Sequence, residues 1–440
     1  MEFASKIFKR TGNKKGAVLV FVAIAIVVIV IFTAFAIDLG YLFVVGNELK
    51  NAADAGALAG AQVLYLNDGT QVNANANQVA FDIARANTSQ RVPVDVHWTA
   101  GQNSGGNVDV QRGHWSFASS TFTANDSLEP VDLWNATTAE LDANLNFINA
   151  VRVWARREDT PALSFFSRIF GYNQYFLRRE AVAYIGFAGT LGPGEADQPI
   201  AICKQAIRDS GGEYTCGVGR MINSGANIGH ETGGWTNFTQ GPCSTASASS
   251  VRPLICSSGN PGPLYLGEGM GTVGGMQQTG YDRLIECWQT QAGLPARPNS
   301  NNPADFPTAP WQLKLPVVDC PGNNMGNCSE LVGAVVLNVI WITRTGFKNS
   351  LAPIPTRMAG IPNDDPNIHI PDWVSPGLTP QENWQDFVRH FKLKDVLNNS
   401  DATAEDKTIY FLPDCTPHPL AGNTGGENFG VLARIPVLVK

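Results

Sequence analysis

The chain has 440 residues, of which 44% are hydrophobic and 16% are charged, and its formal net charge is −7. This share of apolar side chains excludes an intrinsically disordered chain, and the length suffices for about two globular units. The acidic balance excludes a nucleic-acid-binding surface, because such a surface concentrates positive charge against phosphates.

Residues 17–37 form an apolar run without a charge or a proline. At about 1.5 Å of rise per residue, a helix of this length crosses the roughly 30 Å hydrocarbon core of a bilayer. The run therefore predicts one transmembrane helix, closed by Asp38. The residues before it are basic, which places them in the cytoplasm and everything after Asp38 outside it. These topology residues are Lys6, Lys9, Arg10, Lys14 and Lys15.

Two processed forms compete with a permanent anchor. Ala34-Phe35-Ala36 offers the small-x-small pattern of a signal-peptide cleavage site. However, the apolar run is longer than the roughly 7–15 residues of a signal peptide, and the helical pattern continues through this point. Cleavage after Gly16 would instead match prepilin processing, for which a glutamate is usual at the fifth mature position; Phe21 stands there. We therefore expect the helix to remain as an anchor.

The helical pattern continues beyond the span into a stalk over residues 38–66. Its apolar residues recur every three or four positions, which keeps them on one face of the helix. Ala52, Gly56 and Gly60 on this stalk are small and would let another backbone approach closely. Two interpretations stay open: this face packs on the chain's own folded unit, or it mediates self-association.

Residues 67–190 predict a helix-backed antiparallel sheet. A helix is expected over residues 72–88 and a short amphipathic helix over 163–171. Alternating or β-branched residues between turns predict strands. These strands are expected at 92–98, 107–115, 150–157 and 177–187. A sheet of this kind on a long membrane helix is pilin-like in outline, and glycine, proline and charge mark residues 191–199 as a linker.

Residues 200–440 predict a β-rich exported domain. Strands are expected at 331–343, 408–412 and 429–439. The first of these is too short for a second membrane span and contains Asn338, so we expect a buried strand. A helix is expected within residues 377–397, with Thr379 as its cap, Pro380 in its first turn and one apolar face. That face comprises Trp384, Phe387, Val388 and Phe391.

All eight cysteines lie in this exported domain. An even number confined to the oxidisable part of the chain predicts disulfide bonds. No Cys-x-x-Cys spacing suits zinc, an iron–sulfur cluster or haem. Proximity in the sequence suggests four pairs, one of many arrangements that eight cysteines permit. The suggested pairs are Cys203 with Cys216, Cys243 with Cys256, Cys320 with Cys328, and Cys287 with Cys415.

The sequence predicts no catalytic, cofactor or metal site. The glycine pattern of residues 269–274 matches a dinucleotide-binding motif, but no acidic residue follows at about twenty residues, so a turn is expected. His230-Glu231 lacks the second histidine of a zinc-protease helix. Asp364-Asp365 lies between prolines and fits a surface turn better than a calcium site. The histidines stand singly, and no serine occupies a nucleophile elbow.

Residues 16–61 resemble the TadE/TadG-like proteins of the Flp (tight adherence, Tad) pilus system, chiefly in the aspartate that closes the span and in the sequence ELKNAADAGALAGA. Weaker similarities extend the resemblance to about Gly189. They lie at 110–123, 149–158, 165–171 and 181–187. Some TadG-like chains carry a von Willebrand type A domain with an Asp-x-Ser-x-Ser metal site; that motif is absent here, so metal-dependent adhesion is not expected.

The resemblance implies a non-enzymatic, membrane-anchored component of bacterial pilus assembly, surface adhesion or secretion. Its partners would be the membrane and other Tad/Flp pilus or envelope proteins. It would reside in the bacterial inner membrane as a single-pass protein, with its C-terminal bulk periplasmic or extracellular.

Two functions of other classes stay open. A membrane-tethered hydrolase would require separated His, Asp and Ser or Glu side chains to converge in a pocket. A binding module for a carbohydrate or envelope polymer would require a groove with exposed tryptophans, although core packing is the usual role of this residue. The candidates are Trp235, Trp288, Trp311, Trp341, Trp373 and Trp384.

The sequence as a whole predicts an α+β protein with one transmembrane helix. The predicted order is a cytoplasmic basic tail (1–16), a transmembrane helix (17–37), a stalk helix (38–66), a helix-backed antiparallel sheet unit (67–190), a linker (191–199) and a β-rich, disulfide-containing exported domain (200–440).

Overall fold

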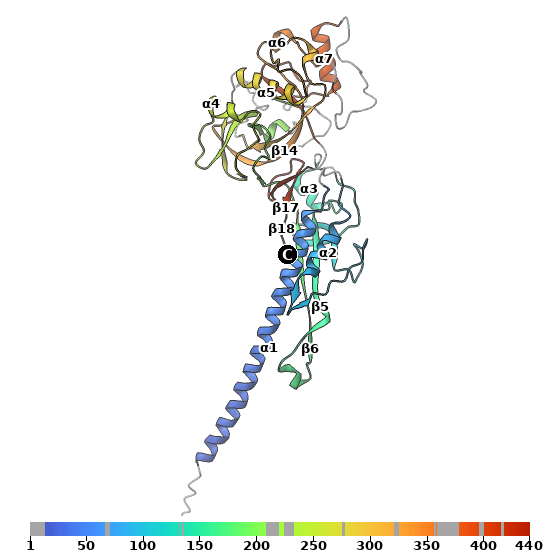
Figure 1. Cartoon of the computed structure of the whole chain (residues 1–440), viewed down its shortest axis with the longest axis vertical. Coiled ribbons are helices and arrows are strands. Elements are labelled where there is room, and N and C mark those ends of the chain that lie inside the picture. Colours follow the sequence, from blue (N-terminus) through green and yellow to red (C-terminus); the bar gives the residue numbers. More distant parts are fainter. Residues whose placement is uncertain are drawn as a thin grey trace, which may run out of the picture.

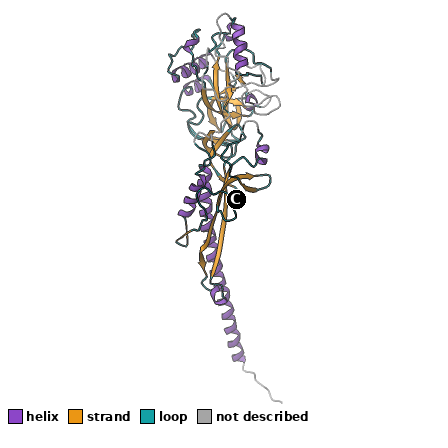
Figure 2. Cartoon of the chain, turned by 90° about the vertical axis from the view of Figure 1, so that its right-hand side faces the viewer, coloured by secondary structure: helices purple, strands orange, loops and turns teal. Residues whose placement is uncertain are grey.

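The computed structural model describes most of the chain and confirms the α+β class. The described residues are 14–66, 71–131, 133, 136–207, 220–223, 233–274, 278–320, 325–355, 358, 378–395, 400–414 and 418–440. A long helix leads into a first sheet, and a second, larger sheet lies beyond it, which makes the molecule elongated (Figures 1 and 2).

Helix α1 (Lys14–Gln62) is continuous from the predicted span into the predicted stalk. Its first half is bare: the most apolar stretch has no buried residue, and the helix is long and apolar enough to cross a membrane. Its second half is buried from Val45 to Ala61 along one face. The helix ends four residues before the predicted Leu66, because Asn73 Nδ2 donates to the Val63 carbonyl at 2.8 Å and the chain turns back.

The first sheet is antiparallel and has the order β18-β6-β5-β3-β4. The strands are β3 (Val110–Ser116), β4 (Thr121–Ala124), β5 (Ala150–Leu163), β6 (Gln174–Tyr184) and β18 (Val437–Leu438). Helix α1 and helix α2 (Ala76–Ala86) pack on it with a shared core, as the helix-backed sheet predicted. The short helix α3 (Thr138–Ala143) lies at the end of this unit that is far from the start of α1 (Figure 1).

The predicted strand at 92–98 is wrong in extent. Only β2 (Val92–Pro93) forms there, paired with β1 (Thr88–Ser89), and a single bridge joins Asp95 to Arg156. The reason is local: the Asp95 carboxylate and the His97 ring bond to the bulged part of β5 in place of a regular ladder.

The second sheet has seven strands in the order β12-β10-β8-β13-β14-β15-β9. They are β8 (Ile200–Cys203), β9 (Arg220–Asn223), β10 (Gly233–Gln240), β12 (Gly269–Val273), β13 (Trp311–Val318), β14 (Cys328–Ile342) and β15 (Thr408–Pro413). All pairs are antiparallel except β8 with β13. The central strand β14 is almost wholly buried, which confirms the buried strand predicted at 331–343.

Helices of the second unit pack on this sheet. They are α4 (Ala248–Val251), α5 (Gln278–Gln291), α6 (Phe347–Ser350) and α7 (Pro380–His390). Helix α7 confirms its prediction, because Thr379 and Glu382 form a capping box and the apolar face is buried. Helix α5 was not predicted from the sequence. Its buried residues Tyr281, Leu284, Ile285 and Trp288 do follow helical spacing, which is the signal that could have identified it.

The remaining short elements connect these layers. They are β7 (Thr190–Leu191), β11 (Leu264–Tyr265), β16 (His418–Asn423), β17 (Val431–Ile435), and the 3-10 turns η1 (Ser167–Phe170), η2 (Lys204–Ile207), η3 (Arg252–Leu254) and η4 (Pro303–Asp305). The strand predicted at 429–439 is two strands: β17 pairs with β16, and β18 returns to the first sheet beside β6. Asn428 Nδ2 secures this return by donating to the carbonyls of Leu133 and Ala136.

Three disulfide bonds join described cysteines, and they differ from the pairs suggested by proximity. Their members are Cys203 with Cys320, Cys243 with Cys328, and Cys256 with Cys287. Sequence proximity failed as a guide because strands that are neighbours in a sheet can be distant in sequence. Parallel pairing of β8 with β13 brings Cys203 close to Cys320, which lies 117 residues further along the chain. Cys216 and Cys415 lie outside the described residues.

Candidate functional site

The candidate site lies where α1 leaves its bare half, at Asp38. This carboxylate is 3% exposed although it follows the apolar span directly. It accepts hydrogen bonds from the backbone amides of Phe165 (3.0 Å), Phe166 (3.2 Å) and Ser167 (2.6 Å) and from the Ser167 hydroxyl. Hydrogen bonds to a charged acceptor are stronger than those between neutral groups. Asp38, predicted only as a topology residue, therefore also holds the loop of residues 165–167 against the helix.

That loop is the tip of the β5–β6 hairpin, and we call residues 163–176 the hairpin tip. The hairpin runs from the Ala150–Tyr184 pair to the Leu163–Gln174 pair and lies along α1 (Figures 1 and 2). The short amphipathic helix predicted here forms only a 3-10 turn, η1, because Gly171 takes a left-handed φ of 89° and stops it.

Further contacts join α1 and the β5–β6 hairpin, the two arms of this region, on the C-terminal side of Asp38 in the helix. The rings of Tyr41 and Phe165 meet edge to face with centroids 5.0 Å apart. Arg179 of β6 packs against Gly46, where an added Cβ would lie 2.8 Å from Nη2 of the arginine. One turn further along, Lys50 Nζ donates to the Glu180 carbonyl at 3.0 Å. The hairpin is therefore fixed to α1 along its length.

The small residues of α1 pack inside the chain. Ala52 is fully buried, and a Cβ on Gly56 would lie 2.8 Å from the Ala80 carbonyl oxygen of α2. A Cβ on Gly60 would lie 2.7 Å from Ala80 Cβ and 2.9 Å from Val151. Of the two interpretations of this face, the structure shows packing on the chain's own folded unit. Self-association would therefore need a different surface.

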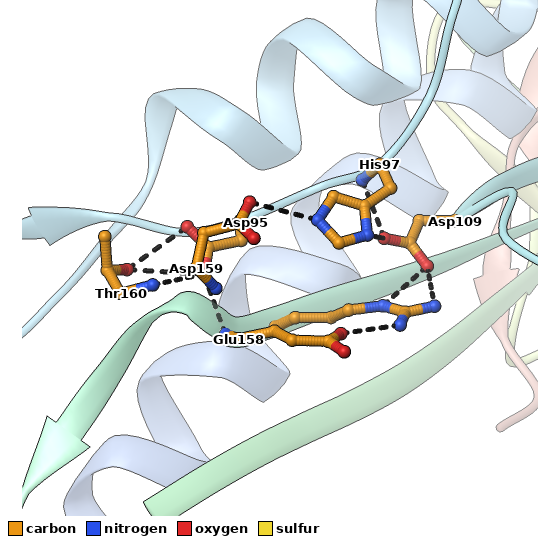
Figure 3. Close-up of polar contacts among 7 residues, drawn as sticks. Asp95, His97, Asp109, Glu158, Asp159 and Thr160 are labelled. Carbon is orange, nitrogen blue, oxygen red and sulfur yellow. Dashed lines mark hydrogen bonds and ion pairs between the residues drawn. The ribbon is translucent and has the colours of Figure 1, made fainter. Parts of the chain in front are cut away.

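A polar network secures the bulge of β5 (Figure 3). Asp109 is fully buried and accepts from the His97 amide at 2.7 Å and from the Arg156 guanidinium. Burial raises the pKa of Asp109, although the His97 amide and Arg156 act in the opposite direction. Asp95 accepts from the amides of Glu158 and Asp159, both at 2.8 Å.

This network positions the bulged strand, and its one hydroxyl, that of Thr160, already donates a hydrogen bond within it. His97 Nε2 lies 3.1 Å from Asp159 Oδ2, which is the kind of pair that could orient a base. The hydroxyl in Figure 3 belongs to Thr160, and it donates to Asp95 at 3.1 Å and not to His97. Each group therefore serves the junction between residues 95–97 and the bulge.

The structure separates the other sequence candidates. The five described tryptophan candidates are between 2% and 8% exposed, so they build the core and are not the exposed tryptophans that a binding groove requires: Trp235, Trp288, Trp311, Trp341 and Trp384. The glycine pattern was predicted as a turn, but it forms strand β12. Glycine is needed in this strand because a Cβ at Gly269 would collide with Cys328 and one at Gly271 would collide with Ser244. His114 is buried, and its ring nitrogens each lie 2.8 Å from a backbone carbonyl.

Other candidates fall outside the described residues. These are Lys6, Lys9, Arg10, His230-Glu231, Asp364-Asp365, His369 and Trp373; Lys14 and Lys15 lie in α1, but their side chains are not described. Within the described residues, no group of three or more His, Cys, Asp or Glu side chains lies close enough to hold a metal ion.

Comparison with known proteins finds two family models that match the first part of the chain. Residues 16–63 match a family model described as Flp pilus-assembly TadE/G-like, and residues 59–183 match a model described as Tad-like Flp pilus-assembly. The two matches cover α1, α2 and the β5–β6 hairpin almost to its end. No curated protein and no solved structure gives a significant match. Over residues 16–183, the chain is similar to the TadE/TadG-like family of the Tad (Flp) pilus-assembly system, and the two matches support the resemblance drawn from the sequence.

Proposed function

We propose that this chain is a single-pass structural component of Tad/Flp pilus assembly, anchored in the bacterial inner membrane through residues 17–37. Its N-terminus would lie in the cytoplasm, and its two sheets would lie in the periplasm or outside the cell. Its partners would be other pilus or envelope proteins.

One observation carries this proposal: α1 is a single helix whose first half is bare and whose second half is built into the core. A continuous helix of this kind fixes the folded unit directly to the apolar segment, as a permanent anchor requires. A leader that is cleaved off needs no such continuity with the fold. The β18 return and the Asn428 hydrogen bonds tie the second unit to the first, so the anchor supports both.

A structural role fits the polar groups of the described part. The buried carboxylates there are Asp38, Asp109 and Asp414, and each accepts hydrogen bonds from groups within the chain. Catalytic carboxylates instead keep a lone pair directed at a pocket.

Complementation tests the function. In a strain that lacks this gene, the full chain should restore surface pili. A version in which residues 1–37 are replaced by a cleavable signal peptide should fold and be exported but should not restore them. The control is a version with residues 17–37 replaced by an unrelated transmembrane helix, which should restore assembly at least in part. Full restoration by the released form would contradict an anchored role.

Topology is tested separately. A reporter that is active only outside the cytoplasm, fused after Lys440, should be active in the native chain. Moving the five basic residues to positions just after the span should reverse the orientation and abolish reporter activity. Unchanged activity would contradict the assignment of the cytoplasmic side.

A further inference from the structure

The hairpin tip exposes a cluster of large apolar side chains. Between 52% and 76% of the surface of each of these side chains is exposed: Leu163, Phe165, Ile169, Phe170, Tyr172 and Phe176. Soluble surfaces seldom gather so many large apolar groups in one place, and such a cluster marks a contact with a partner or a membrane. The cluster is therefore a surface that another apolar phase should cover.

The tip lies at the level where α1 leaves the predicted span. The Asp38 hydrogen bonds hold residues 165–167 against the helix there, and Figure 1 shows the green turn between β5 and β6 beside the lower half of α1. The helix also stays apolar and exposed beyond Asp38, with Phe43 69% and Val44 49% exposed. From Val18 to Val44 the helix covers about 40 Å, which matches a bilayer together with its interfacial layers.

Both arms change from apolar to polar at one height. On α1 the last large exposed apolar residue of this stretch is Val44, and on β6 it is Phe176. Gly46, two residues beyond Val44, is in contact with Arg179, three residues beyond Phe176. The apolar surfaces of helix and hairpin thus form one band with a common upper edge.

We propose that the hairpin tip is a second membrane-embedded element, inserted among the lipids of the leaflet from which α1 emerges, and that it encloses the Asp38 carboxylate there. This inference rests on the proposed anchoring by α1. A carboxylate at that depth is costly unless donors surround it, and the amides of the tip supply those donors without adding a charge.

The charges in the hairpin tip and in the three residues after it favour lipid as the occupant. Residues 163–179 contain three arginines and no acidic residue. Arg168, Arg178 and Arg179 are exposed, and Arg178 also stacks on Trp154 at 4.8 Å. Aromatic rings with arginines beside them suit the layer between acyl chains and phosphate headgroups. The same side chains against a protein would need acidic partners at this height.

Photo-cross-linking tests the proposal on the full chain in vesicles of phosphatidylethanolamine and phosphatidylglycerol. A benzophenone amino acid is placed at Phe170 in the tip, at Phe32 in the span or at Leu145, and adducts are identified by mass. Leu145 is a matched control because it is 53% exposed and precedes the start of β5, at the hairpin end opposite the tip. We expect lipid adducts at Phe170 in a yield similar to that at Phe32. We expect no lipid adducts at Leu145.

The outcomes separate the two proposals. Lipid adducts at Phe32 without any at Phe170 would overturn the inserted tip and leave the anchor intact. Protein adducts at Phe170 in place of lipid would do the same and would identify a protein-docking surface. Failure of lipid adducts at Phe32 would contradict the anchor itself.

A second variant guards against an effect of folding. Ile169→Ser with Phe176→Ser changes only exposed side chains, so it should leave circular dichroism and thermal unfolding unchanged. With the photoreactive group at Phe170, we expect the yield of lipid adducts to fall severalfold in this variant. An unchanged yield would show that the apolar cluster does not drive insertion.

Discussion

Asp38 shows how one residue can serve two roles. In the sequence it marks the end of a span, and in the structure it also accepts four donors from the hairpin tip. The first role follows from hydropathy and charge. The second role could not be predicted, because the donors are mainly backbone amides more than 120 residues away. Every residue except proline has a backbone amide, so the residue types do not reveal which amides will serve as donors.

Replacing Asp38 should release the hairpin tip without unfolding the sheet. Asp38→Ala removes the acceptor of three amides and a hydroxyl, so local opening should become easier by about 2–4 kcal/mol. Amide hydrogen exchange of residues 165–167 should speed up on the order of a hundredfold, while exchange in β5 stays unchanged. Asp38→Asn keeps one acceptor oxygen and should be intermediate. Unchanged exchange in both variants would contradict the role of Asp38 in holding the tip.

Asp142 should make part of the stability depend on pH. Its burial acts to raise the pKa, but hydrogen bonds from the Phe117 and Ala118 amides and the Ser116 hydroxyl, together with His114, outweigh it and lower the pKa of Asp142. A lowered pKa in the folded state gives stability that is present above about pH 4 and is lost as pH falls through the folded-state value.

The pH effect is measured by comparing urea unfolding of the native chain and Asp142→Asn. Near pH 7 the variant should be less stable by about 1 kcal/mol, and the difference should shrink below about pH 4. A difference that grows as the pH falls would show that the carboxylate is not the stabilised form.

At the scale of elements, the close packing of α1 on α2 depends on glycine. Gly60→Ala places a methyl group 2.7 Å from Ala80 Cβ and should destabilise the first unit by about 1–3 kcal/mol in urea unfolding in detergent. Gly40 is the matched control, because nothing lies within 4 Å of its added Cβ. Gly40→Ala should be neutral or stabilising by up to about 1 kcal/mol. Equal effects of the two substitutions would contradict the packing.

The disulfides should contribute according to the loops that they close. The Cys203–Cys320 bond spans 117 residues and the Cys256–Cys287 bond spans 31. Loop-closure entropy then predicts that the double alanine variant of the first pair loses about 1 kcal/mol more stability than that of the second. Both variants are compared by urea unfolding under oxidising conditions. A larger loss for the shorter loop would show that packing around the sulfurs outweighs chain entropy.

Sequence patterns predicted some elements and missed others for identifiable reasons. Helix α7 and strand β14 carry strong local signals, a capping box with an apolar face and a long apolar run. Helix α5 follows a glycine-rich stretch that obscures its start, and β18 is two residues long and defined by its partner β6. Disulfide pairs and sheet order are long-range properties, which a local pattern does not encode.

For the whole molecule, the sequence predicted the class, the long apolar helix and the helix-backed sheet, and the family matches agree over residues 16–183. The hairpin that runs back along α1 was missed as a feature. Its apolar tip was predicted as an ordinary amphipathic helix, because exposure cannot be read from a short apolar segment. The structure shows instead that the tip meets the helix where the bare half ends.

The central claim is that α1 stays whole, with its bare half in the bilayer and its other half in the fold. The direct measurement is the intact mass of the chain recovered from alkali-washed membranes of cells that produce it. We predict the mass of a chain that retains residues 17–37, found in the washed membranes. A freely soluble chain that begins near Ile37 would contradict the account.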